Sequence, residues 1–301
     1  MAYLCVDIGG VSLKYGILDS SGKILLLKVL PTPKTLGTFK DALRKIINDN
    51  RQRINGISIS APAMVDYENL AFYNCEGLPF INGISMEDIL GPENSKIIVK
   101  VESEGRAATT AEVWDGALKD VDSGILLTLG NSVTGGLAID GNYIAGAHQK
   151  AGLFSLIRDE LNVPGSQGLV RSNCSAINMI RAINVVDKHD DVYDGPHAFG
   201  LIEAGDKAAL SIFNNFCKNI AQLMFNMQLL VDVQRFAIGG GISSNELVIK
   251  TIKNAYTDIV AEFPQAQQVL VYPEIVTAKH SRETMIKGVL YCYMEQVNNE
   301  R

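Results

Sequence analysis

The chain has 301 residues, of which 47% are apolar and 20% charged, a balance typical of a globular protein with one large or two medium-sized domains. Its formal net charge of −6 and the lack of any basic block argue against a nucleic-acid-binding protein. No apolar run is long enough to cross a bilayer, and the first residues form a strand pattern in place of a signal peptide, so we expect a cytoplasmic protein without a membrane partner.

Strand and helix patterns alternate along the chain, which predicts an α/β fold. The first three strands form an antiparallel meander joined by tight turns, and a helix with Thr35 as its N-cap follows them. Another strand then enters a proline turn, and the β-branched run KIIVKV predicts a strand that passes directly into a helix, with Glu102 and Glu104 at the junction. In order, these elements are YLCVDIGG, SLKYGILDSSG, KILLLKVL, TLGTFKDALRKIINDN, INGISISAP, KIIVKV and RAATTAEVWDGAL.

The second half of the chain opens with a strand, a glycine-containing loop, a second strand and a turn. Residues from about 162 to 208 have a weaker pattern of helical pieces and loops. A long apolar helix, then a strand with a glycine loop and a helix, and lastly one more helix complete the chain. The patterned segments are SGILLTLGNSVTGGLAIDGNYIAG, ALSIFNNFCKNIAQLMFNMQLLV, RFAIGGGISSNELVIKTIKNAY and RETMIKGVLYCYMEQV.

Two segments of equal length share one plan. DIGGVSLKYGILD, from Asp7 to Asp19, and TLGNSVTGGLAID, from Thr128 to Asp140, each predict a strand, a glycine turn and a return strand. Their separation is far too long for a solenoid repeat. We therefore predict a duplicated domain with the active cleft between the copies, because ligand sites tend to form between domains. The domains are expected at 1–117 and 118–301, with the final helix packing back on the first.

The first glycine turn contains Asp7, Gly9 and Gly10. A glycine pair lets backbone N–H groups approach an anion, Asp7 could hold Mg²⁺ directly or through water, and Lys14 could lie near phosphate oxygens. Taken alone, the turn is more simply explained as a β-hairpin. It is not a Walker loop, because no helix with a GK[ST] start follows it.

Two more glycine turns follow apolar strands, one with Gly130 and Ser132, the other with Gly239, Gly240 and Gly241. Three such turns favour a nucleotide cleft over three unrelated turns. None has the G-x-G-x-x-G spacing of a Rossmann site.

The five cysteines and four histidines are scattered, without the spacing of metal ligands. Free thiols in a reducing cytoplasm fit this distribution better than disulfides. We therefore expect no structural zinc.

In their order and spacing, these motifs resemble those of the ROK family (repressors, open reading frames and sugar kinases), on the two-domain actin/hexokinase-like (ribonuclease H-like) fold with a cleft between the domains. The resemblance covers essentially all 301 residues. Because no DNA-binding extension precedes the first strand and no cysteine zinc motif occurs, the chain is most similar to the short branch with β-glucoside kinases and glucokinase-like sugar kinases. The matching segments are DIGG with Lys14, SAPAMVD, GLPFINGISM, VESEGRAATTAE, LTLGNSVTGG and AIGGGIS.

The resemblance implies an enzyme that transfers the γ-phosphate of ATP, with Mg²⁺, to a sugar or β-glucoside hydroxyl, and it implies a homodimer. Glu104 takes the position of the catalytic aspartate, the base that removes the proton of the sugar hydroxyl. Ser103 takes the position of an asparagine that orients the sugar, and the sugar side also includes Ala63, Asn82 and Gly83. The residues expected on the nucleotide side are Asp7, which would hold Mg²⁺, and Gly9, Gly10, Lys14, Gly130, Asn131, Ser132, Gly239, Gly240 and Gly241.

Several of these positions depart from the family pattern. Glu104 is one methylene longer than aspartate, and a displacement of about 1 Å can lower a rate by roughly 10²-fold. Two other charged residues have simpler explanations. Glu102, next to Ser103, is expected to be structural, and Lys14 is more simply explained as a surface residue of a strand. The other altered positions are Leu153 for a sugar-binding glutamate, Leu156 for a histidine, Ala63 for a glycine, and Asn131, Ser132 and Thr134 in the second loop.

Two classes of function therefore stay open. The first is a sugar kinase with an altered sugar pocket, which Asp7, the glycine pair and the carboxylate of Glu104 favour. The second is a catalytically impaired relative that acts as a sugar- or nucleotide-binding regulatory protein, which the loss of a glutamate at Leu153 favours. We adopt the kinase as the prediction to be tested.

Overall fold

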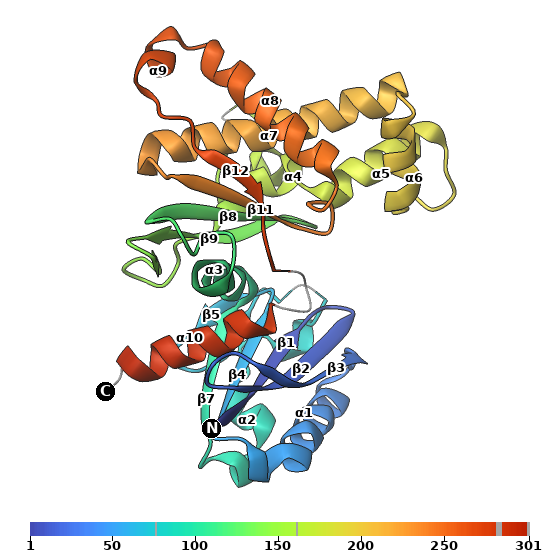
Figure 1. Ribbon diagram of the computed structural model, residues 1–301. Helices are drawn as coiled ribbons and strands as arrows, with labels where there is room; N and C mark the ends of the chain where they lie inside the picture. Colours follow the sequence, from blue (N-terminus) through green and yellow to red (C-terminus); the bar gives the residue numbers. More distant parts are fainter. Residues whose placement is uncertain (76, 161, 281–284, 300–301) are drawn as a thin grey trace. The chain divides into compact units, whose positions relative to one another are not determined.

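The chain divides into two compact α/β units. One is formed by Met1–Trp114 together with the described residues from His280 onward, and the other by Asp115–Lys279. The division falls after Trp114, whereas the predicted one falls after residue 117, and the carboxyl-terminal helix, which was predicted to pack back on the first domain, is part of the first unit. Each unit contains a five-stranded sheet with helices, so the predicted α/β class is confirmed (Figure 1). The computed structural model describes residues 1–75, 77–160, 162–280 and 285–299.

The sheet of the first unit has the strand order β3-β2-β1-β4-β7. β1, β2 and β3 pair antiparallel, which confirms the predicted meander, and β1, β4 and β7 pair parallel. A small antiparallel sheet of β5 and β6, which the sequence did not suggest, follows β4. The strands are β1 (Ala2–Ile8), β2 (Ser12–Asp19), β3 (Ile24–Pro31), β4 (Gly56–Ala61), β5 (Met64–Asp66), β6 (Ala71–Tyr73) and β7 (Ile98–Ser103).

The helices of the first unit begin where the sequence places their signals. The Thr35 side chain accepts a hydrogen bond from the Thr38 N–H at 3.3 Å and caps α1. The final helix was predicted to begin with Arg282, Glu283 and Thr284, which lie outside the described residues. The helices are α1 (Leu36–Asn50), α2 (Met86–Leu90), α3 (Glu104–Asp115) and α10 (Ile286–Asn299), with 3₁₀ turns η1 (Arg51–Arg53), η2 (Pro79–Ile81) and η3 (Pro92–Asn94).

Alternation along β1 assigns its side chains to two cores, because successive residues of a strand point to opposite faces. Leu4 and Val6 belong to a cluster that includes the buried face of α1. Cys5 belongs to a second cluster with residues of α3 and α10. Asp7 shares the face of Cys5, so it lies on the side of the sheet that α10 covers.

The sheet of the second unit has the order β10-β9-β8-β11-β12. As in the first sheet, the first three strands pair antiparallel and the last three pair parallel. The two sheets thus share one topology, as expected of a duplicated domain. The strands are β8 (Ser123–Leu129), β9 (Val133–Ile139), β10 (Asn142–Tyr143), β11 (Arg235–Gly240) and β12 (Glu274–Thr277).

Residues 162–208 are more helical than predicted. Ser175 and Asp194 each accept a hydrogen bond from an N–H three residues later and cap α5 and α6, signals that were present in the sequence but masked by the weak apolar periodicity. Within the described ranges, no helix combines the length and hydropathy needed to span a membrane. The helices of the second unit are α4 (Val170–Asn173), α5 (Ala176–Asp187), α6 (Gly195–Glu203), α7 (Lys207–Val231), α8 (Glu246–Ala261) and α9 (Pro264–Val269), with 3₁₀ turns η4 (Phe154–Leu156) and η5 (Gly165–Gly168).

Candidate active site

Three parallel strands of the first unit carry a row of polar residues near their carboxyl ends. Asp7 of β1 is in register with Ser60 of β4, and Ser60 is in register with Glu102 of β7. All three side chains are buried. Because parallel strands end at the same edge of a sheet, the turns after β1, β4 and β7 leave the sheet together. This edge therefore brings the first glycine turn, Ala63 and Glu104 to one side of the unit.

Asp7 is 6% exposed and has a partner on each carboxylate oxygen. Its Oδ1 accepts a hydrogen bond from Ser60 Oγ at 2.9 Å, and its Oδ2 lies 3.3 Å from Lys14 Nζ. Lys14 is directly opposite Asp7 in the β1–β2 pair, and its side chain is only 12% exposed. The prediction of Lys14 as a surface residue was wrong, because the antiparallel register turns it toward the buried face that carries Asp7.

Side chains just after β3 donate hydrogen bonds to the first glycine turn. Thr32 Oγ1 donates to the Gly9 carbonyl at 2.6 Å, and Lys34 Nζ donates to the Gly10 carbonyl at 2.9 Å. A side chain on Gly9 would place its Cβ 2.8 Å from the Ser12 carbonyl oxygen, so the tight turn requires glycine here. Sequence reasoning missed Thr32 and Lys34, because their partners are backbone carbonyls 23 and 24 residues away.

Glu104 is the first residue of α3 and is partly exposed. Ser103 Oγ accepts the N–H of Arg106 at 3.3 Å and so caps the helix, while the Ser103 N–H donates to Glu102 Oε1 at 2.7 Å. The partial positive charge at a helix amino terminus favours the ionised form of a carboxylate. The junction thus places the Glu104 carboxylate at the amino terminus of a capped helix.

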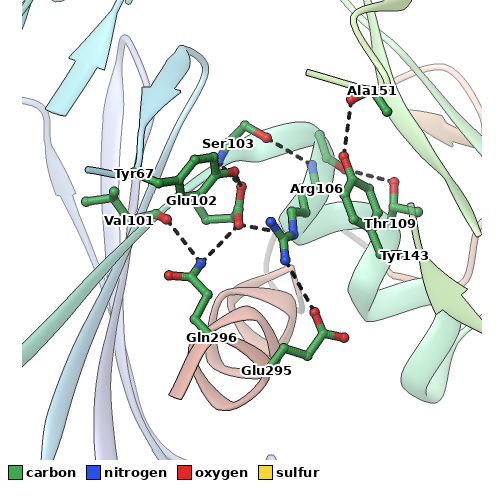
Figure 2. Close-up of polar contacts among 11 residues, drawn as sticks. Tyr67, Val101, Glu102, Ser103, Arg106, Thr109, Tyr143, Ala151, Glu295 and Gln296 are labelled. Carbon is green, nitrogen blue, oxygen red and sulfur yellow. Dashed lines mark hydrogen bonds and ion pairs between the residues drawn. The ribbon is translucent and has the colours of Figure 1, made fainter. Parts of the chain in front are cut away.

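Glu102 is fully buried and has a structural role, as predicted. Its carboxylate accepts hydrogen bonds from Tyr67 Oη at 2.5 Å and Gln296 Nε2 at 3.2 Å, and it pairs with Arg106 Nε at 3.2 Å (Figure 2). Burial raises the pKa of Glu102 above its usual value, and the Arg106 guanidinium opposes this shift. Burial, followed by the charge of Glu102, also raises the pKa of Tyr67.

The predicted sugar-side residues of the first unit follow β4 and β6. The Ala63 N–H donates to the Ala61 carbonyl at 2.8 Å in the proline turn. Asn82 Oδ1 accepts the N–H of Cys75 at 3.1 Å, so this side chain fixes the chain after β6. Gly83 has a φ of +71°, a conformation that favours glycine. Ala63, Asn82 and Gly83 therefore have local structural roles, and their contact with a sugar stays a prediction.

The glycine turns of the second unit lie at the ends of neighbouring strands. Gly240 of β11 is in register with Leu129 of β8, which directly precedes Gly130. Gly240 has a φ of +100°, and a Cβ there would collide with the Leu129 carbonyl oxygen. The structure thus brings the segment with Gly130, Asn131 and Ser132 close to the one with Gly239, Gly240 and Gly241.

The loop after β8 has one further feature suited to an anion, and the start of α5 holds the loop. Ser132 Oγ is buried and has no hydrogen-bond partner among the described residues. The N–H of Ala176, the first residue of α5, donates to the Gly130 carbonyl at 3.0 Å, so the amino terminus of α5 lies at this loop. The next two N–H groups of the helix donate to the same carbonyl and to Ser175 Oγ, so the start of α5 fixes the loop in place. Sequence reasoning missed α5 here, because 46 residues separate Gly130 from Ala176.

The two glycine hairpins are not equivalent in register. Ile8 pairs with Leu13 in the first, and Leu129 pairs with Val133 in the second. The loop between these pairs is thus one residue shorter in the second hairpin, although the two sequence segments have equal length.

Leu153 and Leu156 lie on the surface of the second unit and are 37% and 45% exposed. Leu153 precedes the η4 turn and Leu156 is its last residue, and the preceding Gly152 packs closely against the Gly135 carbonyl of β9. An apolar surface therefore borders the strand that follows the second glycine loop.

The chain matches known proteins along nearly its whole length. The model of a family described as "ROK family" matches residues 3–295. A β-glucoside kinase of Listeria innocua is 24% identical over 301 residues, which cover 99% of each chain. A glucokinase of Halalkalibacterium halodurans is 26% identical over 281 residues, which cover 84% of each chain.

Solved structures confirm the fold. A ROK family protein of Streptococcus pneumoniae in complex with sucrose superposes with a TM-score of 0.86 at 24% identity, covering 99% of this chain and 100% of that one. A ROK family glucokinase of Streptomyces griseus in complex with glucose and AMPPNP gives a TM-score of 0.77 at 22% identity, covering 96% and 98%. The predicted actin/hexokinase-like fold is thus confirmed.

Proposed function

Since the chain belongs to the ROK family, we propose that it is an ATP-dependent sugar kinase with an altered sugar pocket. The observation that carries the proposal is the position of Glu104 at the amino terminus of α3, on the edge of the sheet where the Asp7 turn also ends. In the reaction, a sugar hydroxyl oxygen forms a bond to the γ-phosphorus while the bond to the ADP oxygen breaks. Glu104 takes the proton of the hydroxyl.

The loops after β8 and β11 of the second unit have features that suit a phosphate group. The turn at Gly240 has no room for a side chain, and the neighbouring loop carries Ser132 Oγ, a hydroxyl without a hydrogen-bond partner among the described residues. We propose that Asp7 holds Mg²⁺, directly or through water, because a carboxylate is a ligand that Mg²⁺ prefers. Bound Mg²⁺ would neutralise charge that develops on the phosphates. Lys14 would hold Asp7 in place and add positive charge nearby.

We also propose a sugar partner on the side of Ser103, Ala63, Asn82 and Gly83, and a homodimer in the cytoplasm. The support for a dimer is a set of strongly exposed apolar side chains in the second unit, and the support for the cytoplasm is five buried cysteines without disulfides. The molar mass measured by light scattering during size-exclusion chromatography tests whether the protein is a dimer. The exposed apolar residues are Leu229, Leu230, Val269 and Val271.

A second candidate function is a regulatory protein that binds a sugar or nucleotide without turnover. The exposed apolar side chains of Leu153 and Leu156 favour it, because they offer no hydrogen bond to a hydroxyl. The deciding experiment is a screen for ADP release with ATP, Mg²⁺ and a panel of hexoses, aminosugars and β-glucosides. Release that depends on one sugar supports the kinase, whereas binding of ATP or sugar by calorimetry without turnover supports the regulator.

Replacing Asp7 with asparagine is expected to lower kcat by about tenfold and to raise the Mg²⁺ concentration needed for half-maximal rate, because a neutral amide is a poorer Mg²⁺ ligand. Initial rates over a Mg²⁺ titration measure both effects. Asp41→Asn, which alters an exposed carboxylate of α1, should leave the Mg²⁺ curve unchanged. An Asp7→Asn enzyme with the parent curve would remove Asp7 from the metal site.

A further inference from the structure

The carboxyl-terminal helix reaches the junction between β7 and α3 with two side chains. Gln296 Nε2 donates to the Val101 carbonyl at 3.3 Å and to Glu102 Oε2 at 3.2 Å. Glu295 Oε2 lies 3.6 Å from Arg106 Nη2. Figure 2 shows both residues of α10 pointing toward Glu102 and Arg106. Residues almost 200 positions apart in the sequence thus share one polar cluster.

Arg106 carries a buried positive charge between two carboxylates. Its side chain is 10% exposed, against 0% for Glu102 and 41% for Glu295. Its guanidinium carbon also lies 5.9 Å from the centre of the Tyr67 ring, within the range of a cation–π contact. Because unpaired buried charge is costly, each member of this cluster restricts the positions of the others.

The carboxylate of Glu102 transmits this restriction to the start of α3. Its Oε1 accepts the N–H of Ser103, the residue before Glu104, and its Oε2 faces Arg106 and Gln296. The Arg106 N–H in turn donates to Ser103 Oγ. The backbone on both sides of Glu104 is therefore tied to one buried carboxylate, and through it to α10.

We propose that Arg106 and Gln296 are positioning residues for Glu104, so that α10 sets where the catalytic carboxylate lies. The inference rests on the proposed role of Glu104 as the base. A base must lie within hydrogen-bond reach of the hydroxyl, and a misplacement of about 1 Å can cost on the order of 10²-fold in rate. Glu104 has a long, flexible side chain, which increases its need for a fixed backbone.

The test replaces Gln296 with methionine, which keeps the size of the side chain and removes both donors. We expect kcat to fall by about tenfold while KM for sugar and ATP stays within about twofold, because loss of position affects the transition state. The matched control is Asn298→Met, because Asn298 is an exposed amide residue of the same helix. We expect this variant to leave kcat unchanged. In a second series Arg106→Lys, which keeps the charge, should retain more activity than Arg106→Met.

The fluorescence of Trp114 separates positioning from folding. It is the only tryptophan of the chain, lies on α3, and its ring contacts the ring of Tyr291 on α10. Under the proposal, Gln296→Met keeps the parent emission spectrum while kcat falls. A drop in kcat that appears only with a shifted spectrum and partial unfolding would assign Gln296 a folding role and overturn the proposal. If the parent is active and Gln296→Met has the same kcat, the proposal is also overturned. If the parent phosphorylates no sugar, both this inference and the proposed kinase function are overturned.

Discussion

Replacing Glu104 with glutamine is expected to lower kcat by roughly 100-fold or more, because the amide keeps the size and hydrogen bonding of the side chain but cannot accept a proton. Glu104 is the first residue of α3 and follows the capping residue Ser103, so the substitution leaves the local backbone intact. Initial rates at saturating ATP and sugar measure the effect. Binding of both ligands, followed by calorimetry, should change little.

Glu104→Asp is the informative companion variant, since it shortens the side chain by one methylene. If the sugar sits in the pose expected from the family, this variant should raise kcat; if the pocket is built around the longer carboxylate, it should lower kcat. Glu102→Gln is the comparison variant, because Glu102 contacts Ser103 and Arg106 and affects Glu104 only through them. Phosphotransfer that persists at the parent rate in Glu104→Gln would exclude Glu104 as the base.

Replacing Gly288 with alanine is expected to destabilise the first unit by roughly 2–4 kcal/mol, since overpacking against backbone forces helices apart. Gly288 lies in α10 where that helix crosses α3, and an added Cβ would collide with the Ala107 carbonyl oxygen and approach Ala111. Helix propensity alone would favour alanine by about 1 kcal/mol. A net loss of stability would therefore be due to the steric collision and not to helix propensity. Urea unfolding followed by Trp114 fluorescence measures the change.

Gly200→Ala is the matched control, because Gly200 lies in α6 and an added Cβ would meet no heavy atom within 4 Å. This variant should gain up to about 1 kcal/mol from helix propensity. Equal stability changes in Gly288→Ala and Gly200→Ala would show that α10 can move away from α3 at little cost. The kinase activity of Gly288→Ala should fall with its stability, since α10 would no longer hold Glu102.

Much of the fold could be predicted from the sequence, because its strands carry clear apolar runs and its helices carry local signals such as Thr35. The glycine turns and the strand-to-helix junction at Glu104 are also local features. The network around Glu102 could not be predicted in the same way, because Tyr67 and Gln296, 35 and 194 positions away, meet it only after long segments of chain have packed. Lys14 shows the same limit, since only the strand register turns it toward Asp7.

The fold also fixes an order of events during synthesis on the ribosome. The second unit, Asp115–Lys279, is continuous in sequence, whereas the first needs a helix that is made after the whole of the second. Domains generally fold as units while the chain emerges. Until α10 has been translated, the first unit lacks Gln296 and Glu295, the partners of Glu102 and Arg106, and the cover of α10 over its sheet. The second unit can therefore fold first, and a message truncated before the codon of Glu295 yields a chain that lacks both α10 contacts with the junction at Glu104.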